Sequence, residues 1–465
     1  MKKLGGKDFV LGFQHLFAMF GATVLVPALT GLSVSATLLF AGLGTLLFHL
    51  VTGRRVPAFL GSSFAFLGGY AAVAEACSNA NIDNFIPYAG IGVACAGVLY
   101  LLLSLLFKVF GAKRVMAYFP PIVTGPIIIA IGLTLSGSAI VNCYSNWIIA
   151  LLAIIVVIVC NIWGKGMIRI IPILLGVIVS YIVAAILAVT VGQTINAGGS
   201  DVIAIMGNPD LVLFETAKID ALKNAAWIGL PITGGDTVFS LAGSGNVSMI
   251  ITSIITIMPI AIATIIEHIG DISAISSTVG QNFIAKPGLH RTLLGDGLAT
   301  MLAALFGAPA NTTYGENTGV LALTKVYDPR VVRLAAIFAA ILAFSPKFAA
   351  LVTLMPAATM GGISLILYGM ISAVGVRNIV ENNVDLTKSR NIIIAAIILV
   401  LSIGIKYGTE AGSISFTAYQ ISTSLSGIAV AAVIGIILNA VLPGKDYEFT
   451  TDPAEKAKTG VDFKV

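Results

Sequence analysis

The sequence has little charge for its length. Only 10% of its 465 residues are Asp, Glu, Lys or Arg, and 57% are hydrophobic. Soluble domains carry about 25% charged residues, so a soluble globular fold is excluded. Apolar stretches of about 20 residues, the length that spans the hydrocarbon core of a bilayer, recur along the chain. These features predict a polytopic, all-α membrane protein embedded in the lipid bilayer.

The residue patterns with which enzymes bind metals or activate nucleophiles are also missing. The four cysteines, Cys77, Cys95, Cys143 and Cys160, have no metal-ligand spacing. There is no HExxH motif, no nucleophile elbow and no phosphate-binding loop, and the glycines near 234–246 are interpreted as loop. These absences predict no catalytic residue, no metal and no cofactor. The net charge of +5 is too small to indicate a nucleic-acid partner.

Fourteen apolar segments can be placed along the chain, seven on each side of a more polar interval at 195–247. They cover residues 8–29, 34–52, 57–76, 88–108, 118–136, 146–163, 168–191, 248–281, 292–308, 310–326, 331–353, 355–376, 391–405 and 423–442. Residues 1–30 lack a signal-peptide cleavage pattern, so the first segment is expected to remain uncleaved.

The basic residues predict the orientation of these segments. With a cytoplasmic N-terminus, all but four of the 26 Lys and Arg residues fall on the inner side. The exceptions are Lys218, Lys223, Lys347 and Lys406. The asymmetry predicts fourteen crossings of the cell membrane, both termini in the cytoplasm and an extracellular loop at 195–247.

One stretch, PANTTYGENTGVLALTK at 309–325, interrupts its apolar surroundings. A proline followed by β-branched and aromatic residues predicts extended backbone at 311–314. Gly315 can break that conformation, and a half-helix is expected from Glu316 onward. Such a break is tolerated at membrane depth only where it is buried in protein or lines a cavity.

The two halves of the chain contain weak matches in the same order. GSSFAF at 61–66 is similar to 311–314, 14–16 to 267–269, and 120–125 to 356–361. Seven crossings in each half then predict an inverted repeat. The broken segments, numbers 3 and 10, would meet near the bilayer midplane and pair as two short antiparallel β-strands. Half-helices starting near Phe66 and Glu316 would direct N–H donors into the space between them.

Ionisable residues occur inside one apolar helix. Glu267 and Asp271 are four residues apart and share a helix face, whereas His268 points about 100° away. Intramembrane charges cost about 2.5–3.5 kcal/mol each on insertion scales, so these acids are expected to face an interior cavity, and at least one of them to carry a proton. The alternative is that Glu267 only bonds polar groups of a neighbouring helix. For His268 and His15 a structural hydrogen bond is the favoured interpretation.

Another acid is interpreted differently. Asp296 follows Arg291 by five residues, near the expected cytoplasmic end of its segment. It is therefore predicted to be a surface charge.

Several motifs together resemble the nucleobase–ascorbate (nucleobase–cation symporter-2) transporter family, nearly end to end. They are QHLFAMFGATVLVPALTG at 14–31, GSSFAF at 61–66, EHIGD at 267–271, PGLHRTLLGDGLAT at 287–300, PANTTYGEN at 309–317 and MGGISLILYG at 360–369. The family signature is Gln, Glu or Pro, then Asn-x-Gly-x4-Thr, then a basic or small residue. It is matched by Glu316, Asn317, Gly319, Thr324 and Lys325. Glutamate in the first position is similar to the bacterial uracil permeases of this family.

The resemblance implies a core domain that binds substrate and a gate domain. The first half is divided into core at 1–112 and gate at 113–194. The second half is divided into core at 248–330 and gate at 331–444, with a cytoplasmic tail at 445–465.

The resemblance also implies proton symport of uracil by alternating access, and commonly a homodimer. By position, Glu267 and Glu316 would bind the base together with the backbone at Phe64 and Gly315. Tyr314 would line the site and Tyr368 would lie on the gate side. Proton coupling is assigned to Glu267, Asp271 and His268, and structural support to His15 and Asn317.

One residue departs from the family pattern, and two other functions stay open. Asp271 stands where some uracil permeases have His, which puts any coupling scheme that relies on imidazole in doubt. The substrate could be xanthine, urate or another base. An anion exchanger of similar architecture is the other alternative, because helix N-termini also bind anions.

Overall fold

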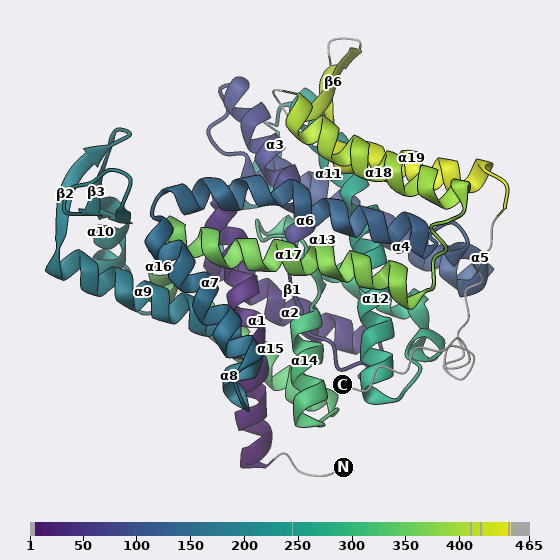
Figure 1. Ribbon diagram of the computed structural model, residues 1–465, viewed down its shortest axis with the longest axis horizontal. Helices are drawn as coiled ribbons and strands as arrows, with labels where there is room; N and C mark the ends of the chain where they lie inside the picture. The colour runs from purple at the N-terminus through teal and green to yellow at the C-terminus, as the bar shows by residue number, and fades with distance from the viewer. Residues whose placement is uncertain (1–4, 244, 410–411, 419–420, 445–446, 448–465) are drawn as a thin grey trace.

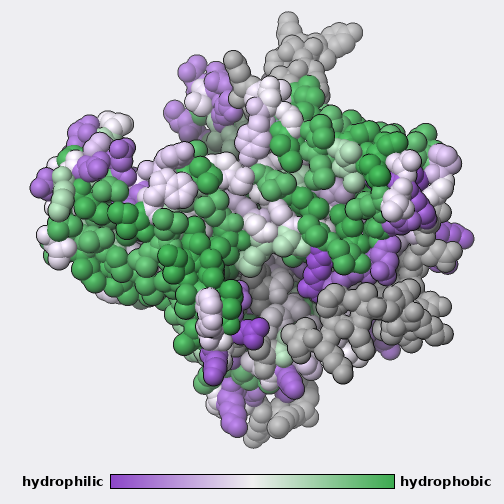
Figure 2. Space-filling view, viewed as in Figure 1, coloured by the Kyte–Doolittle hydropathy of each residue, from purple (hydrophilic) through white to green (hydrophobic). Residues whose placement is uncertain are grey.

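The computed structural model describes residues 5–243, 245–409, 412–418, 421–444 and 447. The described chain is mostly helical, and strand β1 lies at its centre with helices around it (Figure 1). Figure 2 shows hydrophobic side chains across the middle of the molecule, over α7 and α9 on one side and α18 and α19 on the other. This apolar band is the surface that a lipid-exposed helical protein presents.

The first half contains nine helices of the α type, one short 3₁₀ turn and one strand. They are α1 (Gly6–Thr30), α2 (Val34–Val51), β1 (Leu60–Ser62), η1 (Phe64–Phe66), α3 (Leu67–Asn79), α4 (Ile86–Phe110), α5 (Ala112–Met116), α6 (Pro121–Tyr144), α7 (Trp147–Ile162), α8 (Met167–Ile170) and α9 (Pro172–Thr190). Local sequence explains where several begin. Ser33 accepts a hydrogen bond from the Ala36 amide to cap α2, and Asn146 caps α7 in the same way.

The interval after α9 is ordered and partly β. It contains β2 (Gly192–Ala197), β3 (Ser200–Ile205), β4 (Val212–Glu215), α10 (Thr216–Asn224), η2 (Gly234–Asp236) and η3 (Val238–Leu241). The strands form an antiparallel sheet in the order β2-β3-β4. Gly198 and Gly199 connect β2 to β3 with φ angles of 62° and 83°, as a two-residue hairpin requires. The prediction of an all-α protein was therefore wrong here, because alternating residues and a Gly-Gly turn specify a hairpin.

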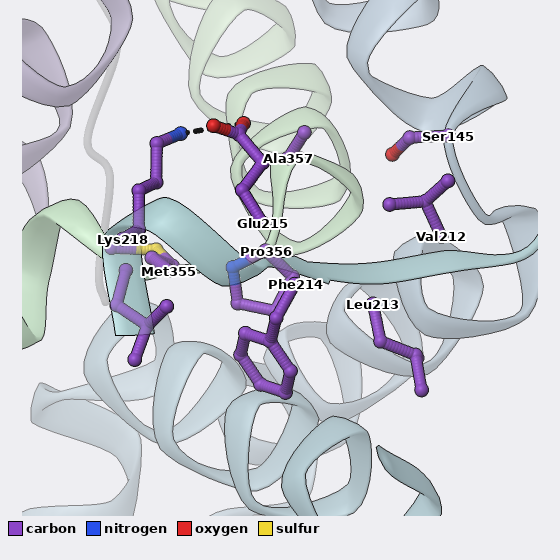
Figure 3. A pocket seen from close by; sticks show the side chains of 10 residues that line it. Ser145, Val212, Leu213, Phe214, Glu215, Lys218, Met355, Pro356 and Ala357 are labelled. Carbon is purple, nitrogen blue, oxygen red and sulfur yellow. Dashed lines mark hydrogen bonds and ion pairs between the residues drawn. The ribbon is translucent and has the colours of Figure 1, made fainter. Parts of the chain in front are cut away.

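Strand β4 of this sheet lies beside the start of α17 (Ala357–Glu381). Figure 3 shows the side chains around a small cavity there. The cavity has a volume of about 30 Å³ and is lined by residues of β4 and of the Leu354–Ala357 segment. That volume holds about two water molecules. Lys218 and Glu215 form an ion pair of 2.8 Å beside it. The cavity is too small for an organic substrate.

The first three elements of the second half form one long broken helix, Val247–Val279. The second half contains α11 (Val247–Ile257), η4 (Met258–Ile260), α12 (Ala261–Val279), η5 (Ile284–Gly288), α13 (Leu289–Leu305), β5 (Asn311–Thr313), α14 (Gly315–Thr324), α15 (Pro329–Leu342), α16 (Pro346–Thr353), α17 (Ala357–Glu381), α18 (Ser389–Gly408), β6 (Ser413–Ala418), β7 (Ile421–Ser426) and α19 (Gly427–Val441). Strands β6 and β7 form a second hairpin that the sequence did not predict.

Within the described residues, eight helices are long and apolar enough to cross a membrane. Helices α15 and α16 make a ninth span if they are taken together, although they meet at 91°. The expected continuous segment at 331–353 was therefore wrong. Ser345 precedes Pro346, is extended at φ −110° and ψ 92°, and caps α16 through the Phe348 amide. The Ser-Pro pair ends one helix and starts another.

Close helix contacts in the protein depend on small residues. A Cβ on Gly375 of α17 would lie 2.7 Å from the Gly125 carbonyl oxygen of α6. A Cβ on Gly297 of α13 would lie 3.1 Å from the Gly97 carbonyl oxygen of α4. Small residues allow helix backbones to approach this closely. The resulting van der Waals contacts hold the helices together in lipid, where no hydrophobic driving force acts between them.

Candidate functional site

The two broken segments meet in the buried centre of the protein. Strands β1 and β5 are antiparallel, with Leu60 opposite Thr313, Gly61 opposite Thr312 and Ser62 opposite Asn311. The pairing continues outward through Ser63 N to Ala310 O at 2.8 Å and Tyr314 N to Phe59 O at 3.0 Å. The structure thus confirms the two-stranded ribbon predicted from residues 61–66 and 311–314.

Side chains satisfy the outer edges of this ribbon. The Thr45 hydroxyl accepts from Leu60 N at 2.9 Å and donates to Leu60 O at 3.2 Å. The Tyr70 hydroxyl accepts from Ala310 N at 2.8 Å, and Thr300 donates to Asn311 O at 3.0 Å. Extended backbone can exist at this depth because surrounding helices supply partners for its polar groups. Thr45, Tyr70 and Thr300 were not predicted, because no residue pattern links them to the strand atoms that they bond, which lie 15, 240 and 11 residues away.

Tyr314 fixes the ribbon to α1. Its hydroxyl donates to the Ser62 carbonyl at 2.8 Å and lies 3.3 Å from the Thr23 hydroxyl. Its ring covers Gly61, where a Cβ would lie 2.5 Å from two ring carbons. Only glycine leaves room for the ring at this position.

The acids of α12 approach the start of α14. Glu267 and Asp271 are both half-buried, while His268 between them is fully buried. Thr313 donates a hydrogen bond from Oγ1 to Asp271 Oδ2 at 2.8 Å. A Cβ on Gly315 would be only 3.7 Å from Asp271 Oδ1. The carboxylate of Asp271 therefore lies beside the first turn of α14, where free N–H groups and the helix dipole favour negative charge.

Glu316 is the second residue of α14, but its side chain lies outside the described part of the structure. The next residue, Asn317, is buried and donates from Nδ2 to the carbonyl of His15 at 3.1 Å. The same Nδ2 is 3.1 Å from His15 Nδ1. His15 and Asn317 thus link α1 to α14 directly after the break.

Asp296 is not a surface charge, and that prediction was wrong. It is fully buried in α13, and its Oδ2 lies 2.8 Å from Nδ1 of His268, which is also fully buried. Tyr100 donates to Thr264 at 2.7 Å one turn before His268. The prediction failed because α13 begins at Leu289 rather than near 292, which places Asp296 in the middle of the helix.

Phe64 and Tyr368 bring the ribbon region into contact with α17. Their rings are 6.2 Å apart between centroids and meet edge to face at 78°. Phe64 begins the turn after β1, and Tyr368 lies in the middle of α17. This contact joins a predicted core residue to a predicted gate residue, directly after strand β1.

The arrangement provides hydrogen-bond donors and acceptors. Carboxylate oxygens on α12 accept, and the helix start at Gly315 presents backbone donors. Among the described residues, no three His, Cys, Asp or Glu side chains gather closely enough to hold a metal ion. Broken helices that place polar groups at membrane depth are characteristic of secondary transporters. The broken helices and the polar groups that they place at membrane depth therefore define a membrane transport protein.

Comparison with known proteins identifies the family. A sequence model described as the Permease family (Xan_ur_permease) matches residues 6–411, and this chain belongs to that family. It is similar to the uracil permease of Bacillus caldolyticus, at 39% identity over 452 residues covering 95% of this chain and 93% of the relative. It is also similar to the uracil permease of Bacillus subtilis strain 168, at 36% identity over 444 residues covering 92% of this chain and 91% of the relative.

Solved structures show the fold more widely. The transmembrane domain of the cyanobacterium bicarbonate transporter BicA matches with a TM-score of 0.60 at 13% identity, covering 94% of this chain and 97% of that one. The structure of SLC26A9 matches with a TM-score of 0.56 at 11% identity, covering 93% of this chain and 64% of that one. The helical framework is thus shared with transporters of very different sequence.

Proposed function

We propose that this permease takes up uracil together with protons by alternating access. The identity to uracil permeases along nearly the whole chain supports the substrate. The observation that carries the proposal is the position of Asp271, bonded to Thr313 and facing Gly315 at the start of α14. It places an acid from one helix against the N-terminus of another, so that acceptors and donors converge.

Uracil has the complementary set of groups. Its ring N–H groups need acceptors, which Glu267 and Glu316 provide, and its carbonyl oxygens need donors, which the backbone at Phe64 and Gly315 provides. Tyr314 shapes the wall of the site through the ribbon. Tyr368 closes it from the gate side, in edge contact with Phe64.

Proton coupling is assigned to the acids of α12. Two carboxylates on one helix face disfavour simultaneous ionisation, so the pair can bind and release a proton as the site opens to either side. Asp271 is engaged by Thr313. We assign the transported proton to Glu267, with Asp271 as its partner on the same helix face and His268 as the link to the buried Asp296.

The proposed topology has fourteen crossings as two inverted repeats of seven, with both termini in the cytoplasm. The core comprises 1–112 and 248–330, and the gate comprises 113–194 and 331–444. The packing supports one change to this division. A Cβ on Gly42 of α2 would lie 3.1 Å from the Ala340 Cβ of α15, and Phe13 of α1 stacks on Phe338 at 4.2 Å, so we place α15 with the core. A homodimer is part of the same proposal.

The test is uptake of labelled uracil into proteoliposomes that carry an imposed pH gradient. Glu267→Gln and Glu316→Ala are each expected to abolish uptake while membrane insertion stays intact. Glu215→Gln removes an acid that is paired with Lys218 near the surface, and it should transport normally. Normal uptake by both site variants would refute the assignment. Competition by unlabelled xanthine or urate would reveal a different base preference.

Anion exchange is the second candidate, because the fold is shared with a bicarbonate transporter. Two acids facing the site oppose it by charge repulsion. Bicarbonate or sulfate flux in the same proteoliposomes, without uracil uptake, would favour this alternative.

A further inference from the structure

A cavity of about 280 Å³ lies between the end of α2 and the beginning of α15, outside the site described above. Its lining combines two arginines, a histidine and two leucines: Leu46, His49, Leu50, Arg54 and Arg333. Four of these come from α2 or the turn after it, and Arg333 comes from the first turns of α15. The cavity lies on the side of the membrane where the basic residues are predicted to gather.

The arginines of this cavity, Arg54 and Arg333, have no ion-pair partner in the part of the chain that the structure describes. Among the described residues, Nη1 of Arg333 is buried without a hydrogen-bond partner. The two guanidinium groups also repel one another. A buried charged donor without a partner is costly, so the site is suited to an anion.

A neighbouring arginine shows the contrast. Arg330, one turn before Arg333, binds Asp328 through Nε at 2.9 Å and Nη2 at 2.5 Å. The Arg330 guanidinium lowers the pKa of the Asp328 carboxyl below its usual value. The acid at this end of α15 forms its ion pair with Arg330 and attracts Arg333 without pairing with it, so two arginines share one acid and the cavity keeps a net positive charge.

The arginines need a hydrogen-bond acceptor from the ligand, whereas His49 needs a donor. It is fully buried, and its Nε2 lies 2.9 Å from the Ala58 carbonyl, to which it must donate. In the neutral ring Nδ1 is then an acceptor, and it has no hydrogen-bond partner among the described residues. A ligand that satisfies all these groups has an anionic oxygen for the arginines and a hydroxyl donor for His49.

Two exposed apolar stripes begin at this cavity. On α2, Leu50 is 63% exposed and Leu43, two turns away on the same face, is 37% exposed. On α15, Ile337 and Ile341 follow Arg333 at four-residue intervals and are 42% and 65% exposed. A polar cavity that continues into apolar helix faces fits a headgroup with acyl chains better than it fits a free anion.

We propose that this cavity binds the headgroup of an anionic glycerophospholipid of the phosphatidylglycerol type. The phosphate lies between Arg54 and Arg333, a glycerol hydroxyl donates to His49, and the acyl chains follow the α2 and α15 stripes. Since α15 packs on α2 at Gly42, a bound lipid holds these two helices together at their charged ends.

The experiment measures lipid retention by native mass spectrometry and the thermal unfolding midpoint of the delipidated protein in detergent. Phosphatidylglycerol is expected to be retained and to raise the midpoint, whereas phosphatidylcholine and glycerol 3-phosphate do so weakly. Arg54→Gln and Arg333→Gln should each weaken phosphatidylglycerol binding about tenfold or more, through the loss of charge-assisted hydrogen bonds. Arg377→Gln, which changes an exposed arginine paired with Glu381, is the matched control.

Each contrary outcome is decisive. Equal effects of phosphatidylcholine would refute recognition of the anionic headgroup. A shift produced by glycerol 3-phosphate as large as that of the lipid would show a free phosphate site instead. Unchanged lipid binding in both arginine variants would place the lipid elsewhere. Leu50→Gln, at a side chain that is 63% exposed, should weaken binding of the lipid but not of glycerol 3-phosphate.

Discussion

At the scale of single residues, the most informative side chain is Asp296. It pairs with His268 in surroundings from which solvent is absent, directly behind the acids of α12. A buried polar or charged pair contributes little net stability, but removal of one partner leaves the other without compensation in a buried place. The main effect of the pair is therefore to hold α12 and α13 in one position relative to each other, and its net contribution to stability is small.

Asp296→Ala is expected to destabilise the protein by about 3–5 kcal/mol, because His268 loses its buried partner. The double variant His268→Leu with Asp296→Leu should recover most of this loss, since a well-packed apolar pair needs no charge compensation. Thermal unfolding in detergent measures both. If the stability lost in the double variant equalled the sum of the losses in the two single variants, His268 and Asp296 would not be coupled.

The sequence predicted some of the site residues but not their partners. Glu267 and Asp271 could be placed on one face because four residues make about one helical turn. The partner of Asp271 is Thr313, 42 residues further along, and no local pattern reports such a contact. The same holds for Tyr70 and Ala310, which are 240 residues apart.

At the scale of elements, the ribbon was predictable because each strand has a local signature. Two small hydroxyl residues and an aromatic recur in both halves, whereas the register of the pairing was not predicted and comes from the structure. Ser345 and Pro346 also mark the bend between α15 and α16 in the sequence. The bend was not predicted because residues 331–353 are mostly apolar and were taken as one segment. The hairpin of β2 and β3 was missed because the interval was treated only as polar.

Gly61→Ala tests how tightly the ribbon is packed. The new methyl group would lie 2.5 Å from the Tyr314 ring and 2.8 Å from the Thr23 hydroxyl, so the ring must move. Such overpacking costs about 1–3 kcal/mol. We expect a lower unfolding midpoint and a loss of uracil uptake.

The matched control is Gly68→Ala on α3, where a Cβ would meet no atom within 4 Å. Alanine in a helix is favoured over glycine by roughly 0.5–1 kcal/mol, so this variant should be at least as stable as the parent. If Gly61→Ala behaved like Gly68→Ala, the close contact with Tyr314 would be unimportant.

At the scale of the whole molecule, transport requires the proposed core and gate to move against each other. Gly21 of α1 and Ile173 of α9 lie on opposite sides of that boundary. A Cβ on Gly21 would be 3.4 Å from the Ile173 Cβ, close to disulfide geometry. A Gly21→Cys, Ile173→Cys pair, in a background with the native cysteines replaced, therefore reports on this movement.

Oxidation of this pair is expected to stop uracil uptake, and reduction should restore it. A control pair at Ile195 and Val202, directly opposite each other in β2 and β3, should cross-link without affecting uptake. Full uptake by the oxidised Gly21–Ile173 pair would contradict motion at this boundary. Cross-linking on gel shift measures the extent of oxidation in both cases.

The pairing of β1 with β5 also constrains how the protein is made. Gly61 obtains its strand partner only when Thr312 has been synthesised, about 250 residues later. At typical translation rates of roughly 5–20 residues per second, this delay lasts on the order of ten to fifty seconds. During that time the Leu60–Ser62 backbone has no strand to bond with, and exposed peptide groups cannot remain in lipid. The nascent first half must therefore keep this segment hydrated or sheltered by the insertion machinery until the second half arrives.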